Sequence, residues 1–480
     1  MSAVLLRSCT DNIFDPAQSP ALIINPTRIP YIPPEIIRVV LSFLKDDRQA
    51  LAACARVNST FNLHVTPILY STVSFTFPYN FSLFADTINY PTYRTQWIKH
   101  LDLSAFSTIG LQKSYAALQN IVDPATLIKI FRACSFLESL SVSESLEEAL
   151  TFDVLKTLFF ECTNIKTIDF CGCSRKTFTD AMNRLTAQMG RTQITYDEFG
   201  YKFVAPASLF PHIKRLSLHE CTTLGEYNVI IPLLSHSPNL THLDVGGCSI
   251  TDVTLRFMMD HTNIPNKLTH LSIAKCKALS SEGIASFIEQ CQSLVNLNVY
   301  ADRPVTTALT EQSLIRIMRL PIMKNIETLD IGSTYIMPSV LRAVKENCSP
   351  KLKKLGIANA PITSLACITD FLSSMPQLEY VDLTNIPCLN LITTNTLLSN
   401  LIKNELHQIH TIELSQALLG KLGTLPGWEI VKNYGRRWYY AKMERKDGVR
   451  ADRVHGRKLD ITATGPERLS NIHQYYSFGV

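Results

Sequence analysis

Most of this chain repeats one pattern of hydrophobic and polar positions, apolar-x-x-apolar-x-apolar. The pattern occurs eleven times, starting at residues 98, 137, 165, 213, 240, 268, 294, 326, 352, 378 and 409. Its last apolar residues alternate with polar ones, which predicts a short strand with Leu and Ile side chains on one face. Because most units start 26–32 residues apart, the period indicates a stacked array of repeats.

The segments between the predicted strands carry apolar residues at helical spacing. Examples are "SITDVTLRFMMDHTN" at 249–263 and "SSEGIASFIEQCQS" at 280–293. A one-sided apolar helix must close against the strands, so we expect an α/β array that curves with parallel strands on its concave face. The 48-residue step after residue 165 holds an insertion near 175–210, which includes Tyr196, Phe199, Tyr201 and Phe203. We expect a loop on one rim, either a recognition loop or a self-packed insertion.

Cysteines recur at fixed places in the repeats. The sequence resembles the cysteine-containing subclass of leucine-rich repeats over roughly residues 98–420, with Cys173, Cys221, Cys248 and Cys276 three residues after the last strand apolar. Cys134, Cys162, Cys291 and Cys348 lie near the second cysteine position of that subclass. We expect buried thiols at these eight positions. The CxC at 171–173 has no partner pair that would complete a zinc site, so no metal or cofactor is expected.

The stretch "IPPEIIRVVLSFL", residues 32–44, predicts a helix with more apolar residues than one face can hide. Two further short helices follow it, and a module of about forty residues has too little core to stand alone. A contiguous apolar surface of this kind indicates a protein interface. The alternative is that the three helices only cap the repeat array, although a cap needs a polar outer face.

At these residues the chain resembles an F-box. Ile32-Pro33-Pro34-Glu35 corresponds to its Leu-Pro-x-Glu element, Ser42-Phe43-Leu44 to the end of its first helix, and Leu51, Val57 and Phe61 to its later apolar positions. Ile replaces the usual Leu at the start, and Phe61 replaces the usual Trp. The resemblance implies docking on the Skp adaptor of a cullin-RING ubiquitin ligase. The implied adaptor-binding residues are Ile32, Pro33, Ile36, Ile37, Val40, Leu41, Leu44, Leu51, Val57 and Phe61.

The central x of each predicted strand should face the concave side. Reading along the units, acids alternate there with small neutral residues, which limits repulsion between stacked strands. The acids either cap the neighbouring backbone or attract a basic target protein. As candidate substrate-binding residues we take Asp102, Asp169, His219, His242, Asp244, Asn298, Tyr300, Asp330, Asp382 and Glu413.

The net charge of +5 lies entirely in the C-terminal stretch. Residues 426–480 hold eleven Lys and Arg against six Asp and Glu, whereas the rest of the 480 residues is balanced. Aromatic residues are interleaved with the arginines, so this stretch is a hairpin cap for the last repeat, a nucleic-acid-binding tail, or an autoinhibitory segment on the acidic column. We favour the cap, and a nucleic-acid partner is not expected.

No apolar run approaches the roughly 20 residues that span a bilayer, and the start of the chain has no signal-peptide pattern. We therefore expect an intracellular protein, in the cytoplasm, the nucleus or both. No nucleophile, P-loop, zincin or dinucleotide motif occurs, so we predict no catalytic residue. The predicted organisation is an arm at 1–28, an F-box at 29–75, repeats at 76–425 and the basic tail at 426–480. The predicted function is that of a substrate receptor for a Skp–cullin–F-box ubiquitin ligase. A Skp-bound scaffold without ubiquitin chemistry is the alternative.

Overall fold

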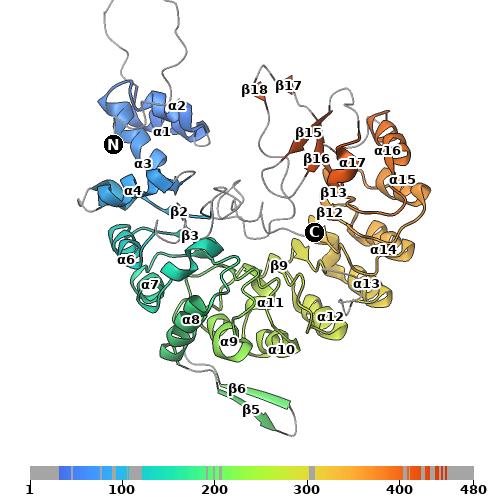
Figure 1. Cartoon of the computed structure of the whole chain (residues 1–480), viewed down its shortest axis with the longest axis horizontal. Coiled ribbons are helices and arrows are strands. Elements are labelled where there is room, and N and C mark those ends of the chain that lie inside the picture. The colour runs from blue at the N-terminus through green and yellow to red at the C-terminus, as the bar shows by residue number, and fades with distance from the viewer. Residues whose placement is uncertain are drawn as a thin grey trace, which may run out of the picture.

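The computed structural model is an arc in which strands line the inside and helices the outside (Figure 1). It describes residues 32–44, 47–75, 78–88, 93–104, 106, 122–190, 193–197, 200–204, 208–301, 309–403, 408–409, 411–422, 428–432, 438–442, 445–446 and 449–450. The predicted N-terminal arm and residues 451–480 lie outside these ranges.

A single sheet runs the length of the arc, and its first twelve strands are parallel. In sheet order they are β1 (Thr72–Ser74), β2 (His100–Asp102), β3 (Ser139–Ser141), β4 (Thr167–Asp169), β7 (Arg215–Ser217), β8 (His242–Asp244), β9 (His270–Ser272), β10 (Asn296–Asn298), β11 (Thr328–Asp330), β12 (Lys354–Gly356), β13 (Tyr380–Asp382) and β14 (Thr411–Glu413). The middle residue of each strand from β2 to β14 is apolar and at most 1% exposed. The predicted strands, their parallel pairing and their position inside the arc are confirmed.

Helices cover the outer side of the sheet and close each repeat (Figure 1). Their bounds are α4 (Pro78–Ile88), η1 (Tyr93–Trp97), α6 (Pro124–Ala133), η2 (Glu144–Ala149), α7 (Phe152–Lys156), η3 (Thr157–Glu161), α8 (Lys176–Gln188), η4 (Glu226–Ile230), α9 (Ile231–His236), α10 (Asp252–His261), α11 (Ile264–Lys267), α12 (Ser281–Gln290), α13 (Glu311–Met318), η6 (Pro321–Asn325), α14 (Pro338–Cys348), α15 (Leu365–Ser373), α16 (Leu391–Lys403) and α17 (Gln416–Leu419). One continuous apolar core lies between helices and sheet.

A tight turn follows the strands, and in the middle repeats a cysteine comes directly after it. The third residue after the strand has a left-handed backbone at Gly172, Glu220, Gly247 and Lys275. The next residue is the repeated cysteine, whose thiol points back to a carbonyl oxygen one repeat earlier, as from Cys248 Sγ to Leu218 O at 3.0 Å. Burial raises the pKa of these thiols. The twelve cysteines within the described ranges are free thiols, as the repeat pattern predicts.

The three N-terminal helices join the sheet directly. They are α1 (Pro34–Phe43), α2 (Arg48–Cys54) and α3 (Ser59–Ser71), and α3 runs into β1 without a linker. The Ser71 carbonyl accepts a hydrogen bond from the Lys99 N–H at 2.9 Å, and the Tyr70 and Trp97 rings lie 6.5 Å apart. The strand pattern in the sequence begins at residue 98, so β1 and α4 add a unit that it did not predict. Residues 72–74 also belong to the sheet, although the predicted F-box includes them.

Two hairpins are added to the repeats. β5 (Gln193–Asp197) and β6 (Gly200–Val204) pair antiparallel and project from the helical side of the arc beyond α8 (Figure 1). The predicted rim loop is therefore a hairpin on the outer side. β15 (Trp428–Lys432) and β16 (Trp438–Lys442) form the second hairpin, and β16 pairs antiparallel with β14 at the end of the sheet. Within the described residues, the start of the 426–480 stretch thus continues the sheet as a hairpin, at the end where the sequence predicts a cap. A short ribbon of β17 (Arg445–Lys446) and β18 (Val449–Arg450) follows.

Candidate docking and recognition surfaces

The first helix has two apolar faces with different fates. Ile37 and Leu41 point inward and are 3% and 0% exposed. They form a small core with Leu51 of α2 and Val65 of α3, separate from the core of the repeats. This core holds the three helices together, and Pro33 and Pro34 start α1 where a proline costs no helical hydrogen bond.

The opposite face of α1 remains in solvent. Ile36, Val39, Val40 and Phe43 are 52%, 53%, 47% and 83% exposed. Their spacing of i, i+3, i+4 and i+7 places them on one side of the helix. Ile32, Val57 and Leu63 are further exposed apolar residues of the same module. Such a contiguous apolar surface is typical of a protein-binding site.

The structure thus divides the predicted adaptor-binding residues into three groups. Ile32, Pro33, Ile36, Val40 and Val57 are exposed, as docking requires, and Leu44 and Phe61 are half-buried against the small core. For Ile37, Leu41 and Leu51 the prediction of a docking surface is wrong, because their side chains are already buried inside the module. Val39, Phe43 and Leu63 were missed, although the helical spacing of the first two was visible in the sequence.

On the concave side, the central acids cap the turns that follow their strands. Asp244 Oδ1 accepts the Gly246 N–H at 2.8 Å, and Asp330 Oδ1 accepts the Gly332 N–H at 3.0 Å. The same bond, from the N–H two residues on, recurs at Asp102, Asp169, Asn298 and Asp382. One side-chain oxygen is therefore engaged at each of these positions. The capping interpretation of the column is confirmed.

Most of the predicted substrate-binding residues are buried, because the turns enclose them. His219 and Tyr300 are 0% and 1% exposed, and the acids from Asp169 to Glu413 are no more than 7% exposed. His219 Nδ1 lies 3.1 Å from Asp244 Oδ1, and the Tyr380 hydroxyl donates to Glu413. The expectation of an open acidic column is wrong. Only Asp102 and His242 of the ten candidates are half-buried.

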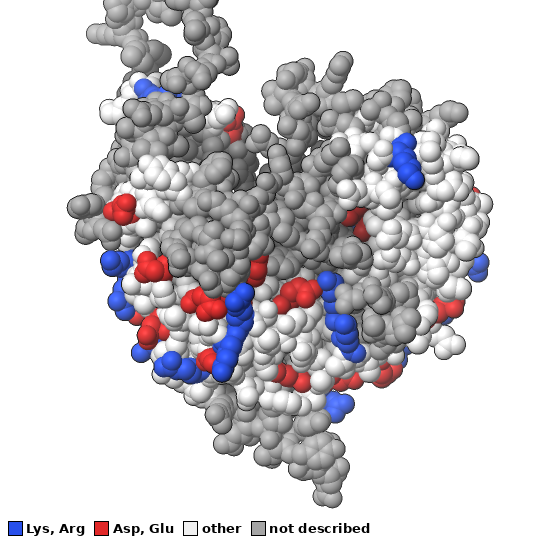
Figure 2. All heavy atoms as spheres, viewed as in Figure 1, with Lys and Arg blue, Asp and Glu red and all other residues white. Residues whose placement is uncertain are grey.

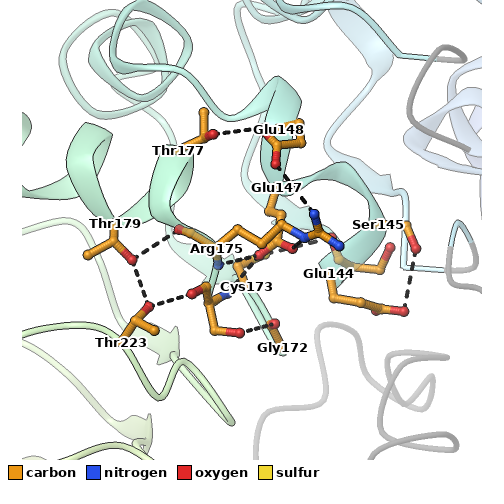
Figure 3. A network of polar contacts seen from close by, with 12 residues as sticks. Glu144, Ser145, Glu147, Glu148, Gly172, Cys173, Arg175, Thr177, Thr179 and Thr223 are labelled. Atoms are coloured by element: carbon orange, nitrogen blue, oxygen red, sulfur yellow. Dashed lines mark hydrogen bonds and ion pairs between the residues drawn. The ribbon is translucent and has the colours of Figure 1, made fainter. Parts of the chain in front are cut away.

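Other carboxylates cap helices of the following repeat. Figure 3 shows Glu147, whose Oε2 accepts the N–H groups of Ser174 and Arg175 at 2.7 and 2.8 Å. Burial raises the pKa of Glu147, while these N–H groups and the charge of Arg175 lower it. Glu226 caps α10 in the same way as Glu147 caps α8. Its carboxylate accepts hydrogen bonds from the backbone N–H groups and hydroxyls of Thr251 and Thr254. Sequence analysis missed these caps, although each joins two neighbouring repeats.

The first variable position of the strands forms a more accessible row. Arg215, His242, His270 and Asn296 are neighbours in register on β7 to β10, and all four are half-buried. Burial, helped by the charges of His270 and Arg215, lowers the pKa of His242 to about 2. Burial and Arg215 lower the pKa of His270 to about 4, against the opposing charge of Glu327. Both rings are therefore neutral near pH 7.

Charges on the surface are mixed in sign. Figure 2 shows acidic and basic residues interspersed over the described surface in view. Many pair across neighbouring repeats: Glu138 lies between Lys99 and Lys166 at 3.1 and 2.8 Å, and Lys353 lies 2.9 Å from Glu327. Over the described surface in view, the interspersed charges give no strong field of one sign that would steer a charged partner.

Within the described ranges, no three His, Cys, Asp or Glu side chains lie together in a way that could hold a metal ion.

None of the described helices combines the length and the apolar character needed to cross a membrane.

Comparisons with known proteins match both parts of the chain. Residues 29–109 match the COS11 F-box domain, and residues 236–255 match a leucine-rich repeat. The F-box protein YLR352W of Saccharomyces cerevisiae is 24% identical over 276 residues, which cover 53% of this chain and 33% of that protein.

Two solved structures are matched at low identity and low TM-score. A chain of the yeast Rad7–Elc1 complex structure is matched at 12% identity and a TM-score of 0.36, over 74% of this chain and 93% of the matched chain. LegL7 of Legionella pneumophila is matched at 14% identity and a TM-score of 0.36, over 71% and 95%. The fold assignment here rests on the strands and helices described above.

Proposed function

We propose that this F-box and leucine-rich-repeat protein is the substrate receptor of a Skp–cullin–F-box ubiquitin ligase. The exposed apolar face of α1 carries the proposal, because it lies within the matched F-box and its own module leaves it uncovered. Covering about 600 Å² of apolar surface would contribute on the order of 15 kcal/mol before the cost of association. In this role α1 docks on the Skp adaptor, and the repeats hold a target protein. Ubiquitin transfer is carried out by the partner subunits.

Purification of the tagged full chain, followed by mass spectrometry, tests the proposal. We expect the Skp adaptor and a cullin to co-purify with wild type, and both to be lost with Ile36→Lys plus Val40→Lys. Both substitutions change exposed residues, so the module should stay folded. Ile392→Lys is the matched control, since Ile392 is an apolar residue 77% exposed on α16 at the other end of the arc.

Two outcomes would contradict the proposal. Retention of the adaptor by the double variant would show that α1 is not the docking helix. Co-purification of the adaptor without any cullin would instead favour a Skp-bound scaffold.

A further inference from the structure

The turn edge of the arc, where each strand leads into its helix, changes character along the repeats. The side chain that follows two residues after the left-handed turn residue is polar in the middle repeats, at Ser174, Thr222, Ser249 and Lys277. In three later repeats the same position is apolar and exposed, at Tyr335, Pro361 and Pro387. These later repeats therefore present apolar residues where the middle ones present polar residues.

The three later turns are joined side by side. Their strands β11, β12 and β13 pair in parallel register. Asn359 Nδ2 donates a hydrogen bond to Ser333 Oγ at 2.7 Å, and Asn385 Nδ2 donates one to Asn359 Oδ1 at 3.1 Å. Because these ladder residues connect neighbouring turns, the apolar residue that follows each of them lies in one row.

The starts of the following helices extend this row. Met337 precedes α14, while Leu391 and Ile392 begin α16, and all three are exposed. Asn390 fixes the start of α16, since its Oδ1 accepts the N–H of Ile392 at 2.9 Å. The apolar strip is the name used below for this set: Tyr335, Met337, Pro361, Pro387, Leu391 and Ile392.

The surroundings of the apolar strip carry no charge in the sequence. The segments 331–341, 356–369 and 383–402 contain no Asp, Glu, Lys or Arg, although these residues make up 18% of the chain. The turn edge of the middle repeats does carry charges, at Arg175, Glu220 and Lys275. Figure 2 shows the same contrast, since the described surface in view is largely white over α14 to α16. Depletion of charge around exposed Tyr and Met is typical of the centre of a protein interface.

Two features decide which partner fits the apolar strip. A charged side chain would lose its water there without meeting an opposite charge, which is unfavourable. Asn385 is exposed at the end of the ladder, and its Oδ1 accepts no hydrogen bond from the described residues. This oxygen can accept an N–H of a polypeptide, whereas a lipid acyl chain has no such hydrogen to give. The fitting partner is an uncharged, apolar stretch of polypeptide.

We propose that the apolar strip binds an uncharged, apolar segment of the target polypeptide. Side chains of that segment pack on Tyr335, Pro361 and Pro387, and one of its backbone N–H groups donates to Asn385 Oδ1. The inference rests on the proposed function, because it assigns the target to this edge of the repeats. It replaces the basic target that the acidic column suggested with a neutral apolar one.

Selection from a random seven-residue peptide library, carried out on the full chain, tests the proposal. We expect Leu, Ile, Phe and Tyr to be enriched in the bound peptides, and Lys, Arg, Asp and Glu to be depleted. For a selected peptide, Tyr335→Ser plus Pro361→Thr plus Pro387→Ser should weaken binding by at least about tenfold, since three apolar contacts are lost. Each substitution introduces a residue type that the middle repeats carry at the same position.

A single variant and a matched control accompany the triple variant. Ile392→Lys places a charge in the apolar strip at a highly exposed position, so it should weaken peptide binding without lowering the melting temperature. Phe136→Ser is the control, because Phe136 is an exposed aromatic residue just before β3 and outside the apolar strip. This control should bind the selected peptide like wild type.

Several results would overturn the assignment. They are enrichment of charged residues, no selection by wild type, and unchanged peptide binding by the triple and Ile392→Lys variants. Sedimentation with phosphatidylcholine vesicles and light scattering examine two other occupants. Vesicle binding that the triple variant loses would assign the apolar strip to a lipid surface, and a dimer that it loses would assign the strip to a second copy of the chain.

Failure of this inference can be told apart from failure of the proposed function. The peptide selection needs no adaptor, so it reports on the apolar strip alone. Co-purification of the Skp adaptor and a cullin reports on α1 alone, and it should be the same for the triple variant and wild type. The melting temperature verifies that the triple variant is folded.

Discussion

The outer face of α1 and the central column of the concave sheet reverse the usual distribution of apolar and polar residues. On α1, Ile36 and Phe43 stand in solvent, whereas on the sheet Asp169 and Asp330 are enclosed. The enclosed acids have partners within the chain, since each accepts a backbone N–H. The exposed apolar residues have none. Under the proposed function, the side chains left for a partner are those that the chain itself does not satisfy, whatever their chemical character.

The largest expected effect is the difference in stability between substitutions on the buried and on the exposed face of α1. Leu41→Ala should destabilise the N-terminal module by about 3 kcal/mol, because it leaves a cavity in a small core. Ile36→Ala should change stability by no more than about 0.5 kcal/mol, because Ile36 is already half in solvent. Hydrogen exchange of residues 47–71 measures both. Equal effects of the two variants would contradict the division into an inner and an outer face.

Removing a carboxylate that caps the next repeat comes second. Glu226→Ala should cost about 2 kcal/mol, since the N–H and hydroxyl donors of Thr251 and Thr254 lose their acceptor. Glu226→Gln keeps one acceptor oxygen and should cost less. Amide exchange in α10 is the measurement. An effect spread evenly over all repeats would show that the cap is not local.

Acid should weaken the concave row next. The pKa values of His242 and His270 lie below the 6.5 of an exposed ring, so the folded chain binds protons less readily than the unfolded chain. The stability of the fold is fully present well above pH 6.5, and it falls as the pH drops from 6.5 toward 4 for His270 and toward 2 for His242. The loss is on the order of 1–2 kcal/mol per ring at pH 5. Melting temperatures at pH 7.5, 6 and 5 measure the loss. A variant with both His242→Phe and His270→Phe should lose less stability between pH 7.5 and pH 5. Equal losses in the variant and in wild type would contradict the assignment of this pH dependence to the two rings.

The smallest effect concerns the enclosed acids. Asp330→Ala should cost about 1 kcal/mol by leaving the Gly332 N–H without its acceptor. Asp330→Asn should cost less, because the amide oxygen can accept the same bond. Urea unfolding compares the two variants. If Asn impairs target binding while stability is kept, the acid has a recognition role after all.

The sequence predicted the sheet well because a period of two and a period of 26–32 residues are both explicit in it. The sequence could not show which face of α1 is buried, since Ile36 with Val40 and Ile37 with Leu41 have the same i, i+4 spacing. Only the packing of α2 and α3 selects the inner pair. β1 was missed because the leading position of its repeat motif is Tyr70, which belongs to helix α3.

Two signals were present but needed the turn geometry to interpret. An Asp two residues before a glycine, as at Asp244 and Asp330, is typical of a side chain that accepts the next-but-one N–H. The tetrapeptide Leu-Thr-His-Leu occurs in two consecutive repeats, and parallel register stacks the rings of its histidines, His242 and His270. Neither this stacking nor the orientation of the rings could be known before the strands were placed.

Because α3 continues directly into β1, the N-terminal helices are rigidly connected to the sheet of the repeats. Ser71 and Thr72 are consecutive, and the Ser71 carbonyl accepts a hydrogen bond from the N–H of Lys99, the residue before β2. The angle between the apolar face of α1 and every strand of the arc is then a property of the fold. A protein bound to the concave strands would be held at a fixed distance and orientation from a partner bound to α1. Two residues inserted between Ser71 and Thr72 would change that orientation.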